Sequence, residues 1–240
     1  MAVAGSGLVT VTRLLLRIGP VDDWVRTIAH HLRVDPILLG TDRDDIDRAL
    51  DAHAGRPLVL SADIAGLSAI LQRLVRRDQV TEIPVGWVAD TDRASRELSS
   101  RLGLPPRPTL AADVATADDV RNVRLVRDDH GGLLLRRGRL SGWAGTATFG
   151  ARTYHDDELV ADGTVRRIDV RPDYEVDCGV VAEVAAGLLR RTTTSTGRSV
   201  QTACDEALST VDGVPHPRPV RKWTWYADPR QHWLLRAPSG

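Results

Sequence analysis

The chain has 240 residues, of which 42% are hydrophobic and 27% charged, a composition typical of folded globular proteins and not of disordered chains. Its formal net charge is zero, so no overall field draws it to nucleic acid or to an anionic membrane. Its two cysteines, Cys178 and Cys204, provide no disulfide framework and no Cys/His metal-binding spacing. The N-terminus lacks the basic segment and long apolar stretch of a signal peptide, which predicts a cytoplasmic protein.

Short apolar runs alternate with helical patterns over the first hundred residues. Strands are expected at Leu14–Leu16, Ile37–Leu39, Pro57–Leu60 and Ile83–Val88. Amphipathic helices are expected at Val21–Leu32, after the capping residue Thr41, at Leu67–Val75 and at Ala94–Leu102. Gly103 can end the last helix in a left-handed conformation. Because strands that alternate with helices favour a parallel sheet, residues 1–106 are predicted to form a Rossmann-like α/β domain.

The character of the sequence changes after the proline-rich segment Pro105–Pro108, which is the best candidate for a linker. Residues 107–240 are rich in Thr, Gly, Arg and turn dipeptides, and apolar residues recur there with a period of two, as at Trp223 and Trp225. These tryptophans fit a packed sheet core or the wall of a lipid-facing cleft. One helix is expected from the apolar side formed by Val180, Val181, Val184, Leu188 and Leu189. We predict an antiparallel β domain with one packed helix.

Two segments that begin at or within predicted strands are candidates for phosphate binding. One runs from Ser61 to Gly66 and the other from Pro84 to Asp90. In α/β proteins, glycine turns and helix N-termini at strand ends expose backbone N–H groups that bind phosphate. A simpler alternative stays open for the first segment, because Asp63 at a strand end also fits an Asx turn or a helix N-cap.

The order of these segments resembles the diacylglycerol kinase family, to which sphingosine kinases and the more distant NAD kinases are related. That family has a strand ending in GGDGT, a helix, and a strand ending in P-x-G-T-x-N-D-x-A. Here Asp63 stands at the aspartate of the first motif, and Ile83–Gly86 falls on the start of the second. The resemblance implies a nucleotide site that includes Asp63, Gly66, Pro84, Gly86 and Asp90.

The second half of the chain continues the resemblance. The family has an A-x-x-D-G segment, matched around Asp162 and Gly163, and later a D-G-E segment, matched by Asp212, Gly213 and Val214. The resemblance places Asp162 and Asp212 toward the cleft, although aspartate in an Asp-Gly dipeptide is also typical of an ordinary turn. Asp212 and Asp162 are therefore the candidate catalytic residues.

Three departures from the family's motifs affect residues that catalysis needs. Ala62 and Ile64 replace glycines beside the aspartate, and each adds a Cβ atom where backbone amides would approach phosphate oxygens. Trp87 replaces a threonine that lies near the nucleotide. Val214 replaces the glutamate that the resemblance implies is the base for the lipid hydroxyl, and a valine cannot accept a proton.

These departures favour a degenerate lipid-kinase-like protein that acts as a binding or regulatory module. The alternative is an active lipid kinase that uses ATP and Mg²⁺ to phosphorylate a lipid hydroxyl, with Asp212 as the nearest remaining base. A third hypothesis is an unrelated α/β enzyme that uses Asp63 and Asp162. The expected partner is a lipid or nucleotide, with no nucleic acid, no transmembrane segment, peripheral membrane contact at most, and a homodimer as a further expectation.

Overall fold

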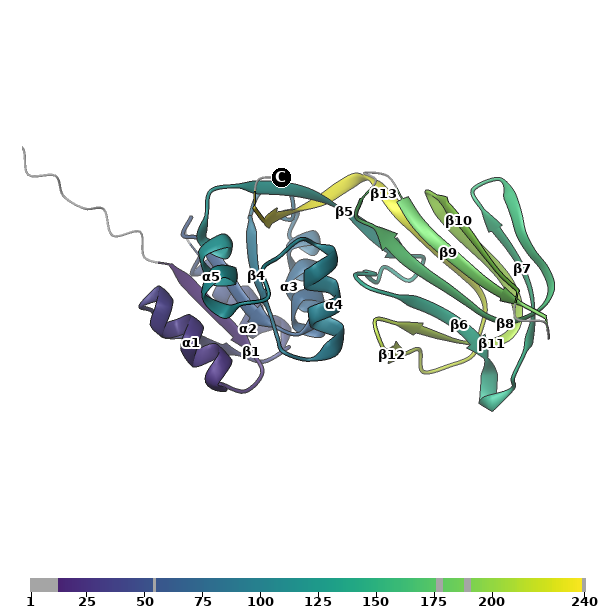
Figure 1. Ribbon diagram of the computed structural model, residues 1–240, viewed down its shortest axis with the longest axis horizontal. Helices are drawn as coiled ribbons and strands as arrows, with labels where there is room; N and C mark the ends of the chain where they lie inside the picture. The colour runs from purple at the N-terminus through teal and green to yellow at the C-terminus, as the bar shows by residue number, and fades with distance from the viewer. Residues whose placement is uncertain (1–12, 54, 176–178, 188–190, 239–240) are drawn as a thin grey trace, which may run out of the picture.

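The computed structural model describes residues 13–53, 55–175, 179–187 and 191–238 (Figure 1). Strands and helices alternate in the N-terminal half, and strands follow one another in the C-terminal half. The N-terminal elements are β1 (Leu14–Ile18), α1 (Asp23–Leu32), β2 (Ile37–Leu39), α2 (Arg43–Asp51), β3 (Leu58–Ala62), α3 (Ile64–Arg76), β4 (Val85–Ala89), α4 (Arg93–Arg101) and α5 (Pro108–Thr116). The later strands are β5 (Val120–Asp128), β6 (Gly138–Gly142), β7 (Phe149–His155), β8 (Glu158–Asp173), β9 (Gly179–Ala186), β10 (Arg191–Gly197), β11 (Ser199–Val211), β12 (Val214–Pro215) and β13 (Val220–Arg236), with a 3₁₀ turn at Trp143–Gly145.

The N-terminal strands pair in the order β2–β1–β3–β4, and each of these pairs is parallel. Strand β3 shows how helices cover both faces of this sheet. Val59 packs with residues of α1 and α5, whereas its neighbours Leu58 and Leu60 pack with residues of α2, α3 and α4. Successive strand residues point to opposite faces, so a strand covered on both sides must be apolar throughout. This accounts for the continuous apolar run that predicted the strand.

Side-chain caps fix where the helices begin. Asp22 accepts a hydrogen bond from the backbone N–H of Val25 and begins α1. Asp42 caps α2 through the N–H of Asp44, so the expectation that Thr41 is the cap is wrong by one residue. Aspartate and threonine both accept hydrogen bonds from free N–H groups, which makes adjacent candidates difficult to separate by sequence. Gly103, with φ +68°, follows α4 in the left-handed conformation that was expected.

Strands β5 to β11 and β13 pair with one another in antiparallel fashion, and the path β10–β9–β8–β6–β11–β13 leads back to β4. Strand β13 is 17 residues long and pairs with β5 over both halves of the protein. Near its end, Leu235 pairs in parallel with Val85 of β4. Figure 1 shows β5 and β13 running together from the all-strand half to the helical half. The two halves therefore share one continuous sheet.

The helix expected around Val180 to Leu189 is wrong, because Gly179–Ala186 forms strand β9 between β8 and β10. Val180, Val181 and Val184 are all buried, so the strand is apolar on both faces. Such a run has no alternation of apolar and polar residues, so its apolar positions also fit the spacing of a helix, although its β-branched valines favour a strand. Leu188 and Leu189 lie outside the described residues.

Helix α5 follows directly on the segment expected to be a linker, and it begins at Pro108. Proline is favoured in the first turn of a helix, where no N–H donor is needed, so the same residue suits a linker and a helix start. The helix lies against β4 at Gly86, where a Cβ atom would come within 2.1 Å of the Ala115 carbonyl oxygen. The predicted boundary at residue 106 falls between α4 and α5. Among the described residues, no helix is long and apolar enough to span a membrane.

Candidate functional site

Of the predicted site residues, Gly86 lies within β4, and Asp90 follows β4 at the carboxyl edge of the parallel sheet, in contact with Arg17. The Arg17 guanidinium is almost fully buried and forms an ion pair with the Asp90 carboxylate. It also donates to Ser61 Oγ at 3.3 Å and to the Pro20 carbonyl at 2.9 Å. Burial raises the pKa of the Asp90 carboxyl, and the hydrogen bond from Arg17 opposes that rise. These internal contacts occupy the Arg17 guanidinium.

Asp63 lies at the same edge, where it is the N-cap of α3. Its carboxylate accepts the backbone N–H of Gly66 at 2.8 Å. A Cβ atom at Gly66 would lie 2.7 Å from Ala62 Cβ and 3.1 Å from Ile18 Cβ. The glycine therefore permits close packing of α3 on the sheet, and one N–H at the helix start is already satisfied by Asp63.

Pro84 and Gly86 lie at the start of β4, at the opposite end of that strand from Asp90. Val85 pairs with Leu58, and Ala89 pairs with Ala62, so β4 separates Gly86 from Asp90 by about 13 Å at the usual rise of a strand. Trp87, between them, is buried in the core and donates from Nε1 to the Ala62 carbonyl at 2.9 Å. The structure thus brings Asp63 and Asp90 to one edge but does not bring Pro84 and Gly86 to them.

A cavity of about 510 Å³ lies between α3 and the turn that joins β11 to β12. We call it the α3 cavity. Its wall is formed by Thr41, by residues of α3 from Ile64 to Gln72, by the segment around Asp128 to Leu133, and by Val211 to Pro217 with Trp223. Val214, at the position of the missing glutamate, is 65% exposed on this wall. The cavity therefore brings together the first turns of α3 and the D-G-V turn.

Asp212 lines the α3 cavity, but its carboxylate is occupied by backbone donors. It accepts N–H groups from Leu135 at 2.8 Å, Arg136 at 2.7 Å and Arg137 at 2.8 Å. Asp212 and Gly213 both have positive φ, the conformation required in a two-residue hairpin turn. Burial raises the pKa of the Asp212 carboxyl, and the three backbone donors oppose that rise. The residue therefore fixes the segment 135–137 to the hairpin.

A second carboxylate of the cavity, that of Asp128, is also bound to the backbone. It accepts the N–H groups of His130 at 2.9 Å and Gly132 at 2.8 Å. Beside it, the His130 ring lies 4.6 Å from Trp223 and the His216 ring lies 5.4 Å from Trp223. The buried indole N–H of Trp223 has no acceptor among the described residues. This end of the cavity is an aromatic surface, and the unpaired indole N–H is buried beneath it.

No arginine or lysine is among the described residues that line the α3 cavity. A triphosphate needs cationic side chains, backbone N–H groups or a metal ion to balance its charge. The carboxylates that could hold a metal ion accept backbone N–H groups instead, and no cluster of three metal-binding side chains occurs in the part of the chain that the structure describes. The α3 cavity therefore suits an apolar molecule with few polar groups better than a polyanion.

Asp162, the other candidate catalytic residue, lies outside the α3 cavity. It forms an ion pair with Arg152 on the neighbouring strand β7, at 2.8 Å, and both side chains are exposed. The hydrogen bond from Arg152 lowers the pKa of the Asp162 carboxyl. Asp212 and Asp162 are thus not brought together.

Sequence reasoning missed Arg17, Asp128 and the histidines of the cavity wall. The turn composition of Asp129–Gly132 was visible, but nothing in a turn dipeptide shows that Asp128 faces a distant helix. Arg17 carried a clearer signal, because a charged residue inside an apolar strand of a two-faced sheet requires a buried partner.

Comparisons with known proteins bear on the fold of this site. No model of a known protein family matches the chain, and no curated protein matches its sequence. The structure is similar to that of a diacylglycerol kinase from Bacillus anthracis str. Sterne, with a TM-score of 0.66 and 14% identity over 94% of this chain and 97% of that one. It is also similar to an NAD kinase from Archaeoglobus fulgidus in complex with ATP, with a TM-score of 0.65 and 13% identity over 94% and 93%. The chain has the fold of these kinases, which confirms the resemblance at that level.

Proposed function

We propose that this protein is a lipid-kinase-like binding module that holds a largely apolar lipid in the α3 cavity and does not transfer phosphate. The observation that carries the proposal is the chemistry of the cavity wall, where both carboxylates accept backbone N–H groups and no arginine or lysine is among the described lining residues. A base must be free to accept a proton, and Val214 cannot replace the glutamate.

The wall also offers positive support for a lipid. Ile64, Leu133 and Val214 provide apolar surface on three sides, and the exposed His130 ring provides a polar group for a carbonyl or hydroxyl oxygen. Ligand sites are mostly apolar surfaces with a few polar groups that fix orientation. A neutral diacylglycerol has two ester carbonyls, one hydroxyl and long apolar chains, so its chemistry matches this wall.

Calorimetric titration of the purified protein with dioctanoylglycerol and, separately, with ATP and Mg²⁺ tests the proposal. We expect heat of binding for the lipid and none for the nucleotide at millimolar concentration. Ala65→Trp should abolish lipid binding, because Ala65 is exposed on the cavity wall and a larger ring would fill the space. Ala203→Trp, at an exposed position on β11, is the matched control and should bind lipid normally.

The alternative is an active ATP-dependent kinase with Asp212 as its base. It is favoured by one observation, that burial raises the pKa of this carboxyl in the cavity wall. We expect no phosphorylation of diacylglycerol above background with radiolabelled ATP in mixed micelles. The double variant Ile64→Gly with Val214→Glu, which restores two residues of the family, is the informative comparison. Robust activity of the unmodified protein that Asp212→Asn abolishes would overturn the proposed function.

A further inference from the structure

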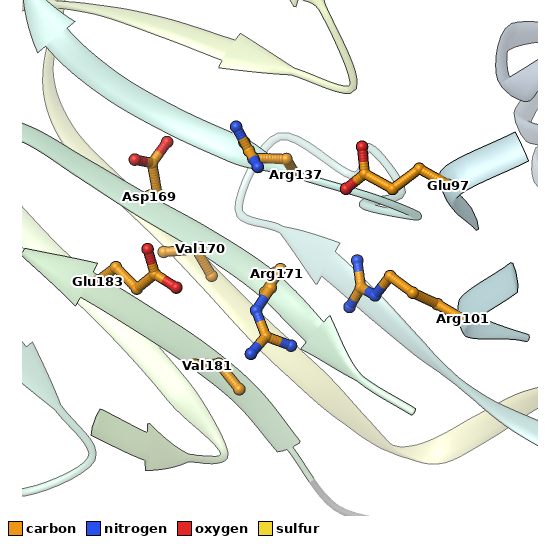
Figure 2. A pocket seen from close by; sticks show the side chains of 8 residues that line it. All are labelled: Glu97, Arg101, Arg137, Asp169, Val170, Arg171, Val181 and Glu183. Carbon is orange, nitrogen blue, oxygen red and sulfur yellow. The ribbon is translucent and has the colours of Figure 1, made fainter. Parts of the chain in front are cut away.

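A second, smaller pocket lies between α4 and the strands β8 and β9, and its wall includes Arg137, whose backbone N–H is bound by Asp212. Its volume is about 220 Å³. Figure 2 shows Arg101 and Glu97 reaching from the α4 side, with Arg137, Arg171 and Asp169 on the strand side. We call it the arginine pocket. It joins the two halves of the protein, because one wall is a helix of the N-terminal half and the other is the C-terminal sheet.

Strand pairing places the charged residues on one face. Asp169 and Arg171 are two positions apart on β8 and therefore point the same way. Their partners on β9 are Glu183 opposite Asp169 and Val181 opposite Arg171. Arg171 consequently has an apolar cross-strand neighbour, and Glu183 lies on the side of the pocket away from Arg101 in Figure 2.

Two of the three carboxylates that line the pocket are neutralised by arginines that do not line it, whereas the third, Glu183, forms no hydrogen bond or ion pair with the residues that the structure describes. Asp169 accepts hydrogen bonds from Arg139 at 2.7 Å and from Arg167 at 2.8 Å. Glu97 accepts from Arg136 at 3.3 Å. Asp169 and Glu97 are therefore bound to other arginines and form no hydrogen bond with the arginines that line the pocket.

Arg101 is a half-buried cation whose donors go to neutral acceptors. It donates to the carbonyl oxygens of Arg136 at 3.2 Å and Pro172 at 2.5 Å, and lies 5.4 Å from the centre of the Tyr174 ring. Burial lowers the pKa of this guanidinium, while the nearby charges of Glu97 and Asp173 oppose the change. The side chains of Arg137 and Arg171 form no hydrogen bond or ion pair with any other residue that the structure describes. The guanidinium groups of Arg101, Arg137 and Arg171 thus border one small pocket, and none of them forms a hydrogen bond with an acidic side chain among the described residues.

We propose that the arginine pocket binds a phosphate monoester group, carried either by a small soluble molecule or by a lipid headgroup. The planar guanidinium fork matches phosphate oxygens in a bidentate manner, and three such forks supply more donors than a carboxylate can use. The volume is below the roughly 300 Å³ at which ordinary ligand pockets begin, so it suits the phosphate group itself and not a whole nucleotide. The site is separate from the α3 cavity and does not depend on what that cavity binds.

The test is calorimetric titration of the full chain at low ionic strength with glycerol 3-phosphate and with glycerol. We expect binding of the phosphate ester alone, weakened at least tenfold in the double variant Arg137→Gln with Arg171→Gln. Both side chains are partly or fully exposed, so the fold should persist. The matched control is Arg76→Gln with Arg96→Gln, which removes two exposed arginines that line neither this pocket nor the α3 cavity and should change affinity less than twofold.

Vesicle sedimentation distinguishes the two sources of the phosphate. Binding to vesicles with phosphatidic acid, but not to vesicles with equal charge from phosphatidylserine, supports the site and assigns it to a headgroup. Binding of the soluble ester without such vesicle binding supports the site and assigns it to a soluble ligand. The proposal is overturned if neither form binds at millimolar concentration, or if the control pair weakens binding as much as the pocket pair.

Discussion

The α3 cavity and the arginine pocket are connected through segment 135–137, which Asp212 of the cavity binds and whose Arg137 lines the pocket, and the two differ in electrostatic character. In the cavity, acids are present and both carboxylates accept backbone N–H groups. In the pocket, three guanidinium groups are present, and two of the three lining acids, Asp169 and Glu97, are bound by other arginines. A charged side chain therefore indicates a ligand site only where no group of the protein already binds it. Asp212 belongs to a family motif, but backbone N–H groups occupy its carboxylate. Arg171 belongs to no motif, and its guanidinium is free to bind a ligand.

The largest effect is expected from Asp212→Ala. It leaves the three N–H groups of residues 135–137 without their acceptor and should lower the free energy of unfolding by about 3 kcal/mol. Asp212→Asn keeps one acceptor oxygen and should lower it by only about 1 kcal/mol. Urea denaturation measures both variants. Equal stability of the two would mean that the carboxylate is not a structural clamp.

A smaller effect is expected from Asp169→Ala in the arginine pocket. Its partners Arg139 and Arg167 are 39% and 45% exposed, so water can solvate them once the acid is removed. The loss should be about 1 kcal/mol and should shrink at high salt. If the variant were as unstable as Asp212→Ala, the contrast between a backbone clamp and a solvated ion pair would be broken.

The pH dependence of stability tests Asp212 further. The pKa of Asp212 is raised in the folded protein, so its contribution to stability is full below about pH 4 and is lost as pH rises through the raised value. Asp212→Asn removes this titration. The stability difference between the unmodified protein and this variant should therefore decrease as pH rises from 4 to 7 in urea denaturation. A difference that increases with pH would show that the backbone donors outweigh burial.

The smallest effect on stability is expected from Val214→Glu. This side chain is 65% exposed at the edge of the cavity, so the substitution should change the free energy of unfolding by less than about 0.5 kcal/mol. Lipid binding should nevertheless weaken, because a carboxylate enters an apolar wall. Thermal denaturation and the lipid titration measure the two quantities. A large loss of stability would show that Val214 packs within the hairpin.

The sequence predicted the elements whose patterns are local. The alternation from Leu14 to Leu102, the acidic start of α1 and the left-handed Gly103 all follow from spacing and residue type. The apolar run at Val180 was misread because a strand buried on both faces has no alternation. The arginine pocket was beyond reach, since Arg101 and Arg171 meet only when α4 packs against β8. Motif order located Asp212, but only the structure shows its three backbone donors.

The parallel contact between Leu235 and Val85 has a consequence for how the protein is made. Trp233 and Leu235 belong to the same hydrophobic core as Leu14 and Leu58, about two hundred residues earlier in synthesis. Contacts between such distant positions close late, and until they close the edge of β4 has no strand beside it on that side. The sheet of the N-terminal half is therefore complete only after β13 has been synthesised and has paired with β4. Pulse-labelled hydrogen exchange should detect protection of the amides of β4 and β13 together, after that of β1 and β3.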